Sequence, residues 1–237
     1  MSNSYQPGTA SRTRGADAID QASVFLRQVF ITMALGLTIT AGAAWYVAQS
    51  EALLQFFYTG AMKWIVMFAP LVFVFIMAAR IHRMSFAAAS LTFAAYSIIN
   101  GISLAFIFVV FELGSVFKVF MITAGTFGAM ALIGLTTRVN LAKFSSIFMM
   151  ALVGLIIASL VNFFLGSSTF DYIISCVGVL LFAGLTAYDT QKMLVIGQSA
   201  DPESDSARKM ALMGALTLYL DFINLFLFLL RIFGSRD

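Results

Sequence analysis

Long apolar segments separated by short polar connections constrain this 237-residue chain more than any other feature of its sequence. Seven segments can be placed, each near the roughly 20 residues that a helix needs to cross the hydrocarbon core. Their approximate limits are 26–49, 62–80, 86–111, 116–136, 144–165, 170–197 and 208–232. Because backbone groups inside a bilayer must be hydrogen-bonded within the protein, such segments form helices. The sequence therefore predicts an all-α polytopic membrane protein whose seven transmembrane helices form one bundle.

The composition supports a membrane location. Apolar residues make up 61% of the chain and charged residues 11%, compared with about 25% charged residues in a typical soluble domain. The 25 phenylalanines provide more apolar surface than a chain of this length can bury, so part of it must face lipid. The net charge is only +3 and the basic residues form no long run. The lipid bilayer is therefore the predicted partner, and nucleic acid is not.

The distribution of lysine and arginine predicts the orientation. With the N-terminus inside, the N-terminal segment and the second, fourth and sixth connections carry ten basic residues: Arg12, Arg14, Arg27, Arg80, Arg83, Arg138, Lys143, Lys192, Arg208 and Lys209. The other side carries four: Lys63, Lys118, Arg231 and Arg236. Because cytoplasmic connections are enriched in basic residues, the N-terminus is predicted to be cytoplasmic and the C-terminus external.

The same reading divides the chain into two parts. Residues 1–25 are predicted to form a polar cytoplasmic tail, and residues 26–237 the seven-helix membrane domain. The second apolar segment contains Pro70, so an arrangement with six spans, in which this segment re-enters the membrane, stays open.

Two aspartates, Asp189 and Asp221, interrupt the last two apolar segments. An ionised carboxylate near the bilayer centre costs at least about 2.5–3.5 kcal/mol, so such residues usually have a partner, a proton or an ion. At 1.5 Å per residue, Asp189 lies about 12 Å from the cytoplasmic end of its helix and Asp221 roughly 19 Å from the start of its own. Tilt of the helices can absorb the difference, so contact between the two side chains is allowed but not required.

Further polar residues accompany the aspartates. Thr217 and Asn224 share a helix face with Asp221, and Asn100 lies near the middle of the third segment. Carboxylate, amide and hydroxyl oxygens are the ligands that calcium accepts. The alternative for Asn100 is an ordinary hydrogen bond between helices. Arg80 and Arg83 are first of all determinants of topology. Both lie in a connection on the predicted cytoplasmic side, from which either guanidinium can reach the acid pair.

Three motifs resemble those of a known family. They are residues 218–226 (Leu-Tyr-Leu-Asp-Phe-Ile-Asn-Leu-Phe), residues 187–191 (Ala-Tyr-Asp-Thr-Gln) and residues 100–103 (Asn-Gly-Ile-Ser). On these motifs the chain resembles the Bax inhibitor-1 family, the transmembrane BAX inhibitor motif proteins. The polar N-terminal segment is similar to that of the bacterial members called YccA-like. The resemblance covers essentially the whole chain.

This resemblance implies a seven-helix fold with a central last helix, located in a bacterial inner membrane. It also implies a cytoplasm-facing aspartate pair that shares a proton and controls a pH-sensitive calcium leak, with calcium weakly bound and no other cofactor. Asp189 and Asp221 match that pair residue by residue. A basic residue latches onto the pair in the family; Arg83 is the best match, and Arg80 stays an alternative. An acid present in the second helix of some members has no counterpart, because residues 64–79 contain no Asp or Glu.

Two other functions are alternatives to an ion leak. The resemblance to YccA-like members implies regulation of a membrane-bound ATP-dependent protease, with the N-terminal tail as the contact. Intramembrane aspartyl proteases also place two aspartates on neighbouring helices, but their second motif reads Gly-x-Gly-Asp, whereas residues 218–221 read Leu-Tyr-Leu-Asp. No enzymatic activity is therefore predicted. The sequence also contains no Gly-rich phosphate-binding loop that could couple transport to nucleotide hydrolysis, so the expected transport is passive.

Overall fold

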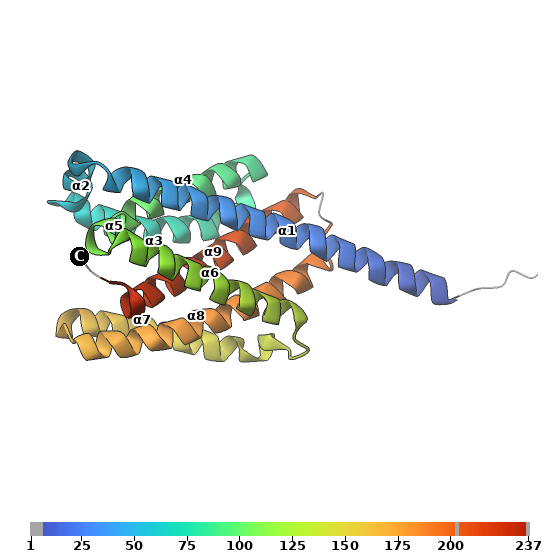
Figure 1. Ribbon diagram of the computed structural model, residues 1–237. Helices are drawn as coiled ribbons and strands as arrows, with labels where there is room; N and C mark the ends of the chain where they lie inside the picture. Colours follow the sequence, from blue (N-terminus) through green and yellow to red (C-terminus); the bar gives the residue numbers. More distant parts are fainter. Residues whose placement is uncertain (1–6, 202–203, 236–237) are drawn as a thin grey trace, which may run out of the picture.

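The computed structural model describes residues 7–201 and 204–235, and the regular elements in these ranges are helices (Figure 1). The α-helices are α1 (Pro7–Ala48), α2 (Glu51–Tyr58), α3 (Met62–Arg80), α4 (Phe86–Leu104), α5 (Ile107–Val110), α6 (Leu113–Thr136), α7 (Ser145–Leu165), α8 (Ser168–Gly197) and α9 (Asp205–Phe233). Two short 3₁₀ helices, η1 (Ile81–Arg83) and η2 (Leu141–Phe144), lie in the connections after α3 and α6.

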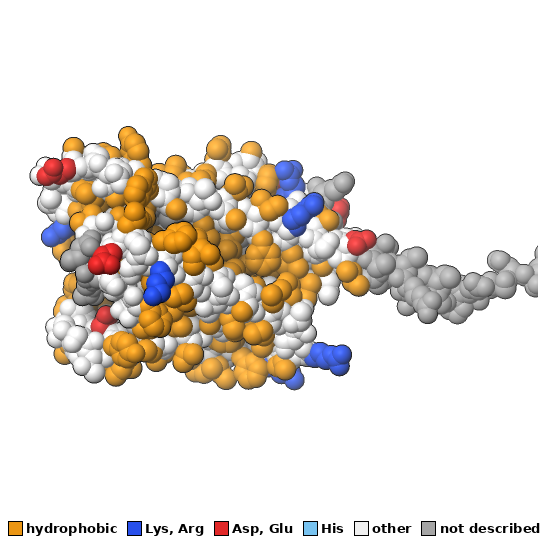
Figure 2. Space-filling view, in the orientation of Figure 1, with side chains coloured by type: hydrophobic (Ala, Val, Ile, Leu, Met, Phe, Trp, Pro, Cys, Tyr) orange, Lys and Arg blue, Asp and Glu red, His pale blue; other side chains and the backbone are white. Residues whose placement is uncertain are grey.

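Seven helical segments are long and apolar enough to cross a membrane, which confirms the predicted number. They are α3, α6, α8, α9, the part of α1 from Ala18 to Ala48, α4 together with α5, and α7 together with η2. The helix α3 is continuous through Pro70, so the structure favours seven spans over six. Figure 2 shows that hydrophobic side chains cover the middle of the visible face, as expected for a surface in contact with lipid.

The last helix lies at the centre of the bundle, as expected from the family resemblance. In the most apolar part of α9, 67% of the residues are buried inside the protein, compared with 44% in α8 and 6% in α7. Helices α8, α1, α6 and α4 all pack against α9, which crosses the middle of the bundle in Figure 1. A polar group on α9 is therefore surrounded by protein rather than by lipid.

The first span begins earlier than predicted. Helix α1 is already helical at Pro7, and Ala22 and Phe25 are buried, although both fall in the segment assigned to the polar tail. The physical reason is a stripe of apolar residues at intervals of three and four, which packs Ala22 and Phe25 against Gly197 at the end of α8. Hydropathy averaged over the whole helix does not detect this stripe, because its outer face is polar. Residues 1–6 lie outside the described part of the chain.

The third span is interrupted between α4 and α5. Tyr58, at the end of α2, compensates the break: its hydroxyl donates a hydrogen bond to the carbonyl of Ile102 and accepts one from the backbone N–H of Phe106, at 3.2 Å. Burial raises the pKa of the Tyr58 phenol, so it stays protonated and able to donate. This short helix in the first connection was not predicted from the sequence.

The bundle has two chemically different ends. The connections through η1 and η2, the connection between α8 and α9, and the start of the first span lie together at one end, named here the basic end. In Figure 2 several lysine and arginine side chains gather at the end from which α1 projects. We expect this end to face the cytoplasm.

Cysteine labelling tests that orientation. In a chain lacking Cys176, single cysteines replacing Ser204 and Ser235 should react with a membrane-impermeant reagent from opposite sides of the membrane, because an odd number of spans separates them. Labelling of both positions from the same side would contradict seven spans. Labelling of Ser204→Cys from outside intact cells would show that the protein has the opposite orientation in the membrane.

Candidate functional site

The structure brings Asp189 and Asp221 together. Helices α8 and α9 form the most extensive helix–helix contact in the bundle, and the two aspartates lie on the faces that meet. The side chains are almost completely buried, with exposed fractions of 6% for Asp189 and 4% for Asp221. Their carboxyl groups lie within hydrogen-bonding reach of each other. The contact that the sequence left open is therefore made in the structure.

Glycines allow the helices around the pair to approach closely. A Cβ atom on Gly134 of α6 would collide with the backbone carbonyl of Ala187, two residues before Asp189. Gly214 of α9 similarly lies against the sulfur of Met193 on α8. Because only glycine leaves room for these contacts, the local sequence sets the spacing of α6, α8 and α9 around the carboxyl groups.

Two buried side-chain oxygen atoms have no hydrogen-bond partner among the described residues: Oδ2 of Asp221, within the pair, and Oγ1 of Thr190, the residue after Asp189. Buried polar atoms are normally hydrogen-bonded, so unpaired ones indicate a place where a proton, a water molecule or an ion can bind. Thr190 was not predicted as a site residue. The available signal was its position in the motif at residues 187–191, next to Asp189.

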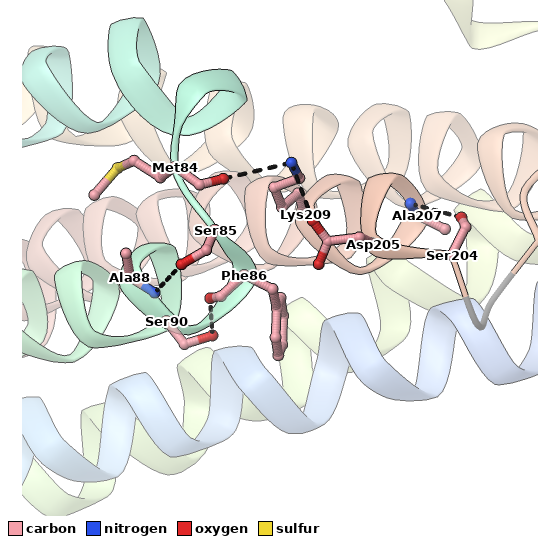
Figure 3. Close-up of polar contacts among 9 residues, drawn as sticks. All are labelled: Met84, Ser85, Phe86, Ala88, Ser90, Ser204, Asp205, Ala207 and Lys209. Carbon is pink, nitrogen blue, oxygen red and sulfur yellow. Dashed lines mark hydrogen bonds and ion pairs between the residues drawn. The ribbon is translucent and has the colours of Figure 1, made fainter.

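The basic residue that acts on the pair from nearby is Lys192, one turn after Asp189 on α8. Arg80 and Arg83 are both exposed, and the two ion pairs between described residues, Lys209–Asp205 and Arg231–Asp171, contain neither of them. The latch assigned to Arg83 or Arg80 therefore stays a prediction. The connection that carries these arginines is held by Lys209, whose ammonium lies 3.4 Å from the carbonyl oxygen of Met84 (Figure 3).

A cavity of about 390 Å³ lies at the basic end, between α8, α9 and the start of η1. We call it the lysine-lined cavity; its lining residues are Ile81, Lys192, Met193, Ile196, Ser206, Lys209, Met210, Met213, Gly214 and Thr217. It reaches Thr217, which precedes Asp221 by one turn of α9. The cavity is thus an approach from the basic end towards the acid pair.

A second polar cavity, of about 430 Å³, lies at the opposite end of the bundle. Its polar lining comprises Ser159 and Asn162 of α7 together with the ion pair between Asp171 and Arg231, whose atoms are 3.4 Å apart. We call it the Asp171–Arg231 cavity. Sequence reasoning did not identify this site, because its residues come from separate helices and form no motif.

The two cavities contact the same stripe of α9. Met213 and Thr217 line the lysine-lined cavity, and Leu227 and Arg231 line the other. Steps of three and four place all of them on one helix face, with Leu220 and Asn224 between them. Asp221 borders this stripe. The pair therefore lies beside the face of α9 that contacts both cavities.

The polar residues predicted to support the pair, Thr217, Asn224 and Asn100, make different kinds of hydrogen bond. Thr217 and Asn224 hydrogen-bond to carbonyl oxygens of their own helix, at 3.1 Å to Met213 and 2.8 Å to Leu220. Asn100 instead donates to the hydroxyl of Tyr219 at 2.7 Å, the ordinary interhelical hydrogen bond weighed as the alternative. That hydroxyl also bonds to Thr40 at 2.6 Å, which joins α1, α4 and α9 inside the bundle. The buried role of Tyr219 was not predicted.

Fold and site together define a class: a polytopic α-helical membrane protein with a carboxyl pair buried on its two last helices. A family model described as "Inhibitor of apoptosis-promoting Bax1" matches residues 22–237. The chain belongs to the Bax inhibitor-1 family.

Several bacterial proteins are similar over nearly their whole length. The inner membrane protein YbhL of Escherichia coli (strain K12) is 44% identical over 214 residues, which cover 90% of this chain and 92% of that protein. An uncharacterized protein of Deinococcus radiodurans is 39% identical over 219 residues, covering 92% and 94%. A third, from Borreliella burgdorferi, is 38% identical over 213 residues, covering 90% and 92%. The similarity to YbhL supports an integral, inner-membrane location.

Proposed function

We propose that this protein is a passive, acid-stimulated calcium leak controlled by the Asp189–Asp221 pair. The single observation that carries the proposal is the position of the pair: two buried carboxyl groups lie where α8 meets the central helix α9, beside an α9 face that has a cavity at each end. Leu220 lies on this face between the two cavities, which share no lining residue. The expected calcium chemistry rests on the family resemblance together with this oxygen-rich site.

Weak binding follows from the number of ligands. Calcium prefers about 6–8 oxygen ligands, and the pair supplies at most four. The described residues contain no group of three or more His, Cys, Asp or Glu side chains that could hold a metal ion. Water must therefore complete the coordination shell. An ion held in this way can leave again, which conduction requires.

The proton acts through the charge of the pair. Two carboxylates in contact inside a poorly solvated bundle cannot both ionise cheaply, so the pair holds one shared proton near neutral pH. A pair that carries negative charge attracts a basic residue at the basic end, for which Arg83 or Arg80 is the proposed latch. Further protonation weakens this attraction and favours the open state, but it also removes calcium ligands. Acid should therefore increase flux and decrease calcium affinity.

Flux in reconstituted vesicles tests the mechanism. Purified protein in liposomes loaded with a calcium indicator should pass calcium faster as the pH falls from about 8 to about 6, without any energy source. Calcium affinity, measured separately by isothermal titration, should fall over the same range. Flux that does not change with pH, in protein shown to be folded by circular dichroism, would contradict the proposal.

Regulation of a membrane-bound protease is the second candidate. The observation that favours it is helix α1, which continues beyond the bundle at the basic end and so offers a contact outside the membrane (Figure 1). A truncation after residue 17 leaves the first span intact, because that span begins at Ala18. In the same vesicles, a chain lacking residues 1–17 should keep its calcium flux, whereas protease regulation should be lost.

A further inference from the structure

The lysine-lined cavity has an unexpected charge for a cation route. Two lysines, Lys192 and Lys209, line it, and none of its described lining residues is acidic. Ser206 and Thr217 add hydroxyl groups, and the remaining wall is formed by methionines, isoleucines and one glycine. A cavity lined by charges of one sign concentrates ions of the opposite sign. The charge of this lining therefore favours an anion over calcium.

The two lysines differ in their present contacts. The ammonium of Lys209 lies 3.3 Å from a carboxylate oxygen of Asp205 and 3.4 Å from the Met84 carbonyl, as Figure 3 shows. Lys192 is exposed, and no ion pair between described residues includes it. Asp205 is itself exposed, so its bond to Lys209 is weak and an incoming anion can share the ammonium. One cation is therefore available and the second can be recruited.

We propose that the lysine-lined cavity is a binding site for a phosphate group. Lys192 and Lys209 hold its oxygens through charge-assisted hydrogen bonds, and the Ser206 hydroxyl, in the first turn of α9, donates a further one. The phosphate comes either from the headgroup of an anionic phospholipid or from free phosphate. Basic pockets between transmembrane helices take lipid headgroups, and Ile196, Met210 and Met213 provide an apolar wall along which an acyl chain can lie.

If the proposed function holds, a bound phosphate also affects the acid pair. Lys192 acts on Asp189 from one turn away, and it also repels a cation that approaches Thr217 from the basic end. An anion bound to Lys192 offsets both effects. Occupancy of the cavity would thus change the access of calcium and protons to the pair, so anionic lipid would regulate the leak from the same end as the proposed latch.

Lipid binding tests the site without any measurement of flux. The purified full-length protein is titrated with phosphatidylglycerol or zwitterionic phosphatidylcholine, and bound lipid is counted by native mass spectrometry. Lys192→Gln and Lys209→Gln should each weaken phosphatidylglycerol binding about fivefold, and the double variant roughly 25-fold. Phosphatidylcholine binding should not change. The matched control is Lys143→Gln, an exposed lysine of η2 at the same end that does not line the cavity, and it should bind as the wild type does.

Inorganic phosphate separates the two sources of the ligand. If the site takes free phosphate, sodium phosphate should raise the melting temperature of the wild type above that in sodium chloride of equal ionic strength, and the double variant should lose this shift. If phosphatidylglycerol binding depends on the two lysines and sodium phosphate does not raise the melting temperature, the ligand is a lipid headgroup. The proposal would be overturned if the double variant bound both ligands as tightly as the wild type does. It would also be overturned if Lys143→Gln weakened binding as much as the substitutions of Lys192 and Lys209 do. Absence of calcium flux would instead refute only the proposed function.

Discussion

Replacement of either Asp189 or Asp221 by asparagine is expected to abolish the acid stimulation of calcium flux. The two carboxyl groups contact in a buried site, so the proton belongs to the pair and neither residue can respond alone. The double variant should therefore behave almost as each single variant does. Calcium flux into liposomes at several pH values, measured for the wild type, both single variants and the double variant, completes the double-mutant cycle.

The chain offers a matched control for this cycle in Asp171. It lies on α8 like Asp189, but it is exposed and pairs with Arg231 at the opposite end of the bundle. Asp171→Asn removes the same charge from the same helix and can change the amount of flux, because Asp171 lines the Asp171–Arg231 cavity, but the flux should still rise in acid. Strictly additive effects of Asp189→Asn and Asp221→Asn would show that the two residues do not act together.

Gly134→Ala is expected to destabilise the bundle by about 1–3 kcal/mol, the usual effect of adding atoms to a packed interior. A Cβ atom at residue 134 would meet the backbone of Ala187, and backbone cannot move aside as a flexible side chain can. Helix α6 must then separate from α8 beside Asp189. Thermal unfolding of the purified protein in detergent, followed by circular dichroism, should show a lower melting temperature.

Gly125→Ala provides the comparison within the same helix. No atom lies within 4 Å of a Cβ atom built on Gly125, so this change should be neutral or stabilise α6 by up to about 1 kcal/mol. The two variants contain the same substitution and differ only in what surrounds it. Equal melting temperatures for both would mean that α6 does not approach α8 as closely as described.

Much of the fold could be predicted from the sequence because transmembrane helices are a property of local composition. Each span is long enough and apolar enough to be recognised by itself, even α3, which contains Pro70 and is largely exposed to lipid. The first span begins earlier than expected, because at Ala22 and Phe25 a buried stripe is combined with a polar outer face. The limits of the third span agree with the prediction, but its helix breaks after Leu104 although the sequence stays apolar.

The site was predicted only in part, for a related reason. Asp189 and Asp221 could be identified because a carboxyl group in an apolar segment is unusual wherever it lies. Asn100 could not be assigned in the same way, because an amide can serve an ion site or an interhelical hydrogen bond equally well. The rotation of α4 relative to α9 decides between these roles and directs Asn100 to Tyr219. Thr190, Tyr219 and the residues of the Asp171–Arg231 cavity were missed because their roles depend on neighbouring helices.

The sequence by itself thus determined the class of protein, the number of spans and the two acidic residues of the site. Those features depend on transfer free energies, which are summed along the chain and do not require knowledge of helix contacts. Only the tertiary structure decided that the two carboxyl groups meet and that a cavity lies at each end of the α9 face beside them. These features depend on how the helices rotate and tilt against one another, which close contacts such as that of Gly134 with Ala187 determine in three dimensions.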